Sequence, residues 1–162
     1  MDAKIDVVPL RFPEGANIIV GQSHFIKTAE DIAEIMVSTV PGAKYGLAFC
    51  EASGPCLIRT EGNERALVDD AVRCAQAAAA GHTFFLILQN AFPINVLERI
   101  KACQEVCRIF CATANPLQLI VGGTEQGRGI LGVIDGFSPK DVEGEKDKAE
   151  RRSMLRKFGY KF

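Results

Sequence analysis

The sequence predicts an α/β protein, and specifically a three-layer α/β/α sandwich on a mixed sheet. Short apolar runs of strand length alternate with amphipathic stretches of helical length, which is the pattern of α/β folds. Residues 83–88 are apolar almost without interruption, as expected of a strand covered on both faces. The tight connection at residues 51–55 permits only an antiparallel neighbour, so we expect antiparallel as well as parallel pairs.

The first elements are two strands and a helix. Residues 5–10 and 16–21 are apolar runs separated by a Pro-Glu-Gly turn, which predicts two strands. A helix is expected to begin at Thr28, an N-cap residue with Asp31 three positions later, and to end at Pro41.

The middle of the chain predicts two strands, a helix and a buried strand. Residues 44–50 and 56–60 flank the turn sequence Ala-Ser-Gly-Pro. Asn63 can cap a helix whose alanine-rich face repeats at helical spacing, and Gly81 can supply its left-handed stop before the strand at 83–88.

The last third predicts a helix, three strands and a terminal helix. Pro93 suits the first turn of a helix that continues through Ile100. The expected strands are residues 107–113, 117–121 and 129–134, and the charged residues 143–157 predict the last helix. We expect the aromatic tail FGYKF to dock on the domain or on another subunit.

Length and charge narrow the class of protein. The chain has 162 residues, so we expect one domain over residues 1–162. Nineteen Lys and Arg oppose twenty Asp and Glu, which favours neither nucleic acid nor an anionic membrane as a partner. No apolar stretch is long enough to span a bilayer, and the start MDAKID lacks the core of a signal peptide. We therefore expect a cytoplasmic protein.

The six cysteines predict neither a disulfide framework nor a metal site. None forms a C-x-x-C pair, and only two histidines exist to complete a zinc shell. In a reducing compartment we expect the thiols to be small buried hydrophobes.

The sequence GQSHFIKT, residues 21–28, is the strongest candidate site. Polar side chains after a strand lie where ligands bind in α/β sheets. Gln22, Ser23, His24 and Lys27 precede a predicted helix, whose first N–H groups attract anions. Phosphate or a carboxylate is the implied ligand, although a helix cap and a loop histidine explain the same residues.

His82 is the alternative catalytic imidazole. It begins the strand at 83–88, and it would lie at the opposite edge from His24 if that strand runs parallel to the second strand. We therefore favour His24.

Three further polar residues also follow predicted strands. They are Glu51, Asn115 and Asp135. The segment GRGILG, residues 127–132, matches G-x-G-x-x-G, but it continues as a strand where a dinucleotide site needs a helix. We expect a flexible glycine loop in which Arg128 can bind phosphate.

Several segments together resemble one known family. The segments are GQSHFIKT, YGLAFCEASGP, GHTFFLIL, FPINVLERIK, CATANPLQLIV, GRGILGVIDG and RRSMLRKFGYKF. They are similar to the adenosine-specific kinase family over nearly the whole chain. The resemblance implies a three-layer α/β/α fold, adenosine or AMP as ligand, a homo-oligomer and adenosine kinase activity.

Phosphoryl transfer needs positive groups around the moving phosphoryl group and a group that orients the nucleophile. We expect His24 to accept the phosphoryl group, Lys27 and Arg128 to stabilise its charge, and Asp135 to hold magnesium or take the adenosine proton. Besides Gln22 and Ser23, we expect substrate contacts from Glu51, Asn95 and Asn115.

Two hypotheses remain open. The chain is either an adenosine kinase that uses Mg²⁺ with a nucleotide phosphate donor, or a nucleoside or AMP sensor without turnover. Only the kinase requires a phosphorylated intermediate or a metal, and we expect no tightly bound cofactor in either case. The sequence lacks a G-x-x-x-x-G-K-[ST] phosphate loop, so the donor is not indicated.

Overall fold

A computed structural model describes residues 2–162 and contains strands and helices close to where the sequence predicts them. The strands are β1 (Lys4–Leu10), β2 (Asn17–Ser23), β3 (Lys44–Cys50), β4 (Ile58–Gly62), β5 (Thr83–Gln89), β6 (Val106–Thr113), β7 (Leu117–Gly123) and β8 (Arg128–Asp135). The helices are α1 (Thr28–Thr39), α2 (Arg65–Ala78), α3 (Pro93–Lys101) and α4 (Glu145–Lys157).

The strands form two sheets that are antiparallel throughout, whereas the sequence predicts one mixed sheet. The larger sheet has the order β4-β3-β5-β2-β6, and the smaller has the order β1-β7-β8. The helical connections β2-α1-β3 and β5-α3-β6 do join parallel strands. In each case one strand of opposite direction lies between the two, so every hydrogen-bonded pair is antiparallel.

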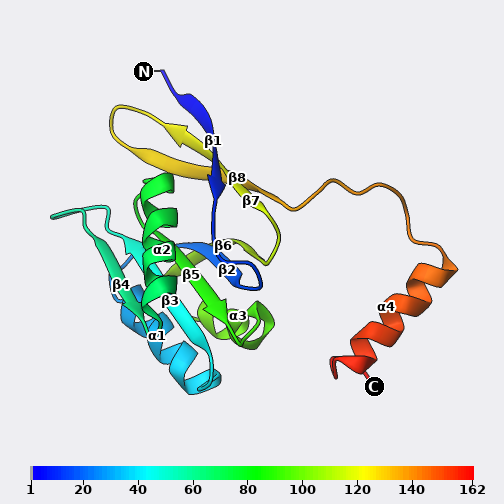
Figure 1. Cartoon of the computed structure of the whole chain (residues 1–162). Coiled ribbons are helices and arrows are strands. Elements are labelled where there is room, and N and C mark those ends of the chain that lie inside the picture. Colours follow the sequence, from blue (N-terminus) through cyan, green and yellow to red (C-terminus); the bar gives the residue numbers. More distant parts are fainter. Residues whose placement is uncertain (1) are drawn as a thin grey trace.

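The sheets and helices form an α/β sandwich, as predicted (Figure 1). Helices α1 and α3 cover one face of the five-stranded sheet, where their apolar side chains pack with those of β2, β3 and β5. On the other face, α2 and the three-stranded sheet share a second core with the same strands. The third layer therefore consists of α2 together with the smaller sheet, so β1, β7 and β8 lie outside the central sheet.

The central strand β5 is covered on both faces, as its composition predicts. Every side chain from Thr83 to Leu88 is buried. Helix α2 lies directly on β3 because Gly46 has no side chain, since a Cβ there would lie 2.1 Å from the carbonyl carbon of Leu67. Small residues of α2, among them Ala71 and Ala75, are fully buried in this contact.

Two helix ends differ from expectation. Lys27, not Thr28, is the N-cap of α1, and no side chain caps this end. Helix α2 ends at Ala79, which adopts the left-handed conformation with φ of 50°, so Gly81 is not the stop. Asn63 does not cap α2, because its side chain bonds the backbone at Ala43 and Tyr45.

Helix α4 stands apart from the rest of the molecule at the end of an extended segment (Figure 1). None of its residues is buried. Docking of this tail on its own domain, one of the two expectations, is therefore not seen. No helix within residues 2–162 is long and apolar enough to cross a membrane.

Candidate functional site

Both histidines belong to one edge of the five-stranded sheet. The backbone N–H of Ser23 at the end of β2 donates to the carbonyl of His82, at 2.9 Å. The N–H of His82 donates to Cys50 at the end of β3, and the N–H of His24 donates to Glu105 just before β6. These bonds join the ends of β2 and β3 to the starts of β5 and β6. We call this end of the sheet, where the four strand termini meet, the histidine edge.

This arrangement corrects the expectation for His82. The expectation placed His82 far from His24 on the premise that β5 runs parallel to β2, but the two strands are antiparallel. The start of β5 therefore meets the end of β2. The His82 ring is half-buried and stacks on Phe49 with 6.0 Å between ring centroids. The backbone of His82 has φ of 61°, a conformation that a non-glycine residue adopts only with some strain.

The N-terminus of α1 is less open to anions than the sequence predicts. The N–H groups of Thr28 and Ala29 already donate to the carbonyls of Phe25 and Ile26. The Thr28 hydroxyl is buried, bonds Ser23 and donates to Phe25 at 2.7 Å. The N–H groups of Thr28 and Ala29, which were expected to attract an anion, therefore already have partners within the protein.

Lys27 is exposed but not free. Its ammonium group pairs with Asp31 one turn along α1. The hydrogen bond that Lys27 donates to the Asp31 carboxylate raises the pKa of Lys27, and the nearby charge of Glu105 adds to the effect. A phosphate at this end would have to compete with Asp31 for the ammonium group.

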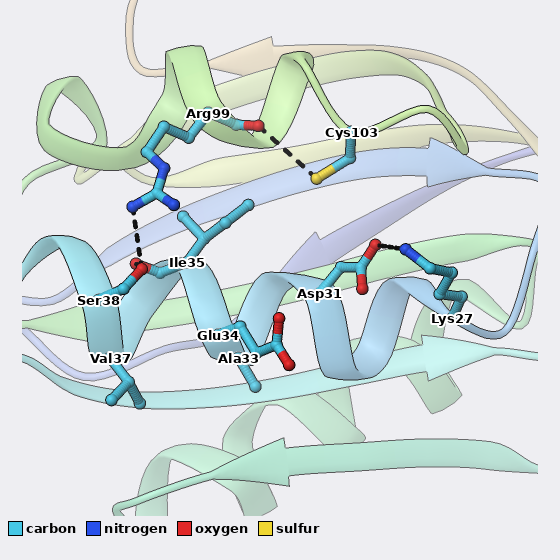
Figure 2. A pocket seen from close by; sticks show the side chains of 9 residues that line it. All are labelled: Lys27, Asp31, Ala33, Glu34, Ile35, Val37, Ser38, Arg99 and Cys103. Carbon is cyan, nitrogen blue, oxygen red and sulfur yellow. Dashed lines mark hydrogen bonds and ion pairs between the residues drawn. The ribbon is translucent and has the colours of Figure 1, made fainter.

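A groove of about 740 Å³ runs between α1 and α3 and begins at Lys27 (Figure 2). Lys27, Asp31 and Ser38 line it from α1, whereas Arg99 and Cys103 face it from α3 and the turn that follows. Figure 2 shows Arg99 reaching across to α1, where its guanidinium donates to Ser38 at 2.9 Å. The groove is large enough for a nucleoside.

A second cavity of about 470 Å³ lies on the other side of the histidine edge, beside the end of α2. Glu51 and Arg128 line it together with Gly81, the residue before His82. The cavity is rich in glycine because the β7–β8 hairpin supplies Gly122, Gly127 and Gly129.

Each charged side chain of the second cavity already has protein partners. Glu51 accepts hydrogen bonds from the N–H of Leu57 and from Arg59, and these bonds hold the pKa of its carboxyl below the usual range. Arg128 lies 3.8 Å from Asp6 and donates a long hydrogen bond to Ala77.

Three predicted site residues lie at the opposite end of the sheet. Asp135 is at the far end of β8 from Arg128, about 23 Å away at the usual rise per residue. Its carboxylate accepts hydrogen bonds from Thr113 and Asn115. Asn95 bonds the N–H of Phe92 and so fixes the start of α3, which follows the far end of β5. Within one chain the structure does not bring these residues to His24.

The predicted set is thus divided by the fold. Four residues, Gln22, Ser23, His24 and Lys27, lie at the histidine edge. Glu51 and Arg128 line the cavity beside it. The interpretation of GRGILG as part of a strand is confirmed, because residues 128–135 form β8 and no helix follows before residue 145.

The sequence analysis missed a cluster at the head of the groove. The ligand atoms of Asp31, Cys103 and Glu105 lie within 4.8 Å of one another. Burial, followed by the charges of Glu105 and Asp31, raises the pKa of the Cys103 thiol. The three residues are distant in sequence and match no spacing motif, and only the pairing of α1 with α3 brings them together.

Comparisons with known proteins identify a family and a similar solved structure. The family model described as adenosine specific kinase matches residues 8–161. The crystal structure of the PH1918 protein from Pyrococcus horikoshii OT3 is 41% identical, with a TM-score of 0.94 over 99% of each chain. No curated protein matches the chain.

Proposed function

Because the chain belongs to the adenosine-specific kinase family, we propose that it binds adenosine and transfers a phosphoryl group to it at the histidine edge. The observation that supports this site is the antiparallel pairing of β2 with β5. This pairing brings the two histidines of the sequence to the same end of the sheet. They lie there between two cavities, each lined by at least one positively charged side chain.

The proposed reaction has two steps. A ring nitrogen of His24 attacks the terminal phosphoryl group of a nucleotide donor, so that a P–N bond forms while the P–O bond to the leaving diphosphate breaks. The 5′-oxygen of adenosine then attacks the phosphohistidine and releases AMP, while the hydroxyl proton passes to solvent. His24 suits the first step because its side chain is exposed and can meet a donor from solution.

Lys27 and Arg128 are the proposed cations for this chemistry. Lys27 stands three residues after His24, on the α1 side of the edge. Arg128 forms a strand bridge with Ala80, two residues before His82, on the other side. A phosphoryl group at the edge would therefore be approached by positive charge from both sides, once Lys27 exchanges Asp31 for phosphate.

The residues do not support the magnesium role expected for Asp135. A metal that serves a phosphoryl group at His24 must lie within a few ångströms of it. Asp135 lies at the opposite end of β8 from Arg128 and is already bonded by Thr113 and Asn115. We derive no step through a magnesium ion at Asp135.

Binding without turnover is the second candidate function. The ion pair of Lys27 with Asp31 and the engaged N–H groups of Thr28 and Ala29 favour it. These contacts leave few unoccupied donors for a transferring phosphoryl group. Under this alternative the chain is a nucleoside or AMP sensor.

We also propose a homo-oligomer, because helix α4 and its aromatic tail find no cover within the chain. Phe158 is 62% exposed and Phe162 is fully exposed at the C-terminus. Apolar side chains in this number are rarely left in water, so a second copy is the expected partner.

Incubation with adenosine, Mg²⁺ and ATP labelled at the terminal phosphate tests the proposal. The products to measure are AMP and acid-labile phosphate bound to protein. His24→Asn and His82→Asn form a matched pair, since asparagine tolerates the left-handed backbone that position 82 requires.

We expect wild type and His82→Asn to carry acid-labile phosphate and His24→Asn to carry none. Saturable AMP binding without any product in the wild type would support the sensor. Undiminished AMP formation in both variants would contradict a histidine intermediate.

A further inference from the structure

A cluster of two carboxylates and a thiol, the side-chain types that bind metals, lies at the head of the α1–α3 groove, next to Lys27. Asp31 lies in the first turn of α1, Cys103 lies in the turn after α3, and Glu105 directly precedes β6. Their ligand atoms all lie within 4.8 Å of one another. Figure 2 shows the Asp31 carboxylate and the Cys103 sulfur facing the same space between the helices.

Glu105 is the observation that indicates a ligand. Its side chain is only 3% exposed, and its Oε1 atom is buried without a hydrogen-bond partner. Among residues 2–162 Glu105 forms no ion pair, and Lys27, on which its charge acts, pairs with Asp31 instead. Buried carboxylates are normally paired or bind a metal, so this group lacks the partner that its burial requires.

A backbone hydrogen bond accounts for the position of residue 105, but it does not require an acidic side chain there. Its carbonyl accepts the N–H of His24 at 3.0 Å, which holds residue 105 at the sheet edge. Any residue would provide that bond. The carboxylate is directed instead toward Asp31 and Cys103, where a second acid raises its electrostatic cost.

We propose that Asp31, Cys103 and Glu105 bind a divalent transition metal of the zinc class, with a fourth position open to the groove. A thiolate with carboxylates suits zinc or cobalt, whereas magnesium prefers oxygen ligands alone. Zinc bonds of about 2.3 Å to sulfur and about 2.0 Å to oxygen put ligand atoms about 3.5 Å apart. Because the ligand atoms lie within 4.8 Å of one another, the side chains need to close by at most about 1.3 Å.

Metal binding would also change the partner of Lys27. Asp31 holds this ammonium group in the structure, and ligation of Asp31 would weaken that ion pair. The cation would then be free to turn into the groove. The metal site stands independently of adenosine or a phosphate donor, so its test needs neither.

Titration of the full-length protein with Co²⁺ tests the site. We expect one equivalent per chain to give a thiolate-to-cobalt charge-transfer band that Zn²⁺ abolishes by competition. Cys103→Ser should remove the band, and Glu105→Gln should weaken Co²⁺ binding at least tenfold. Cys56→Ser and Glu34→Gln are matched controls, because both residues are exposed and lie outside the cluster, and they should bind as wild type.

Thermal unfolding gives a second readout that does not depend on spectroscopy. Without metal, Glu105→Gln should be at least as stable as wild type, because it removes a buried charge. With Zn²⁺, wild type should gain stability and Glu105→Gln should not. A flat cobalt titration, an unchanged band in Cys103→Ser, or displacement of cobalt by equimolar Mg²⁺ would overturn the proposal.

Discussion

Backbone strain at single residues is concentrated beside the proposed reaction site. Four non-glycine residues have positive φ among those that the structure describes, namely Cys56, Ala79, His82 and Asn90. Cys56 and Ala79 line the second cavity, and His82 follows its lining residue Gly81. Such conformations cost energy and persist where the surroundings fix them, frequently at functional sites. This observation supports the histidine edge as the site.

Burial raises the pKa of the Cys74 thiol, and this shift predicts how the free energy of unfolding depends on pH. The thiol is 2% exposed and donates to the carbonyl of Arg11. Burial raises its pKa from 9.0 to about 11. The folded state therefore keeps the proton while the unfolded state loses it above pH 9, so this contribution to stability is complete below pH 9 and is lost as the pH rises toward 11.

Cys74→Ala tests this effect by urea denaturation at pH 7.5 and pH 10.5. At the lower pH the variant should be less stable by about 2 kcal/mol, because it leaves a small cavity. At the higher pH the difference should shrink by about 2 kcal/mol, since only the unfolded wild type is stabilised by releasing the proton of Cys74. Cys56→Ala, at an exposed position, should show no such change. A difference that is equal at both pH values would refute the role of burial.

At the scale of elements, the sequence predicts where strands and helices lie but not how the strands interleave. The apolar runs and turns place β2, β5 and α3 within about two residues of their observed bounds. The connection β2-α1-β3 suggests parallel neighbours, and the two strands do run parallel. That β5 inserts between them depends on tertiary packing over residues far apart in sequence. The directions of these strands decided the placement of His82.

The candidate site was predictable only where its residues are local in sequence. His24 and Lys27 stand in one short segment after a strand, and the structure keeps them together at the histidine edge. Asp135 and Arg128 are both in β8, and an extended strand necessarily separates its two ends. Glu105 carries no local pattern, because its importance arises from burial against α1.

For the whole molecule, the C-terminal arm, residues 136–162, is the feature that most needs a partner. Figure 1 shows it extending away from both sheets, and α4 buries none of its residues. Neither core contains a residue of the arm, so its removal should leave both cores intact. We therefore expect the arm to hold copies of the chain together.

Light scattering after size-exclusion chromatography tests the role of the arm. The full chain should have the mass of an oligomer, whereas a chain ending at Gly136 should be a folded monomer by circular dichroism. Phe158→Ser combined with Phe162→Ser should weaken the oligomer, while Glu150→Ser should not. An unchanged oligomer in the truncated chain would assign assembly to another surface.

The central claim is that nucleoside phosphate binds at the edge where β2 meets β5, and imidazole signals in a ¹H–¹⁵N spectrum test it most directly. The chain has two histidines, so the spectrum is simple, and His82→Asn assigns it. Addition of AMP should shift the signals of His24 and, through the shared edge, those of His82. Saturable AMP binding that moves neither imidazole would contradict the account and direct attention to the opposite end of the sheet, where Asn115 and Asp135 lie.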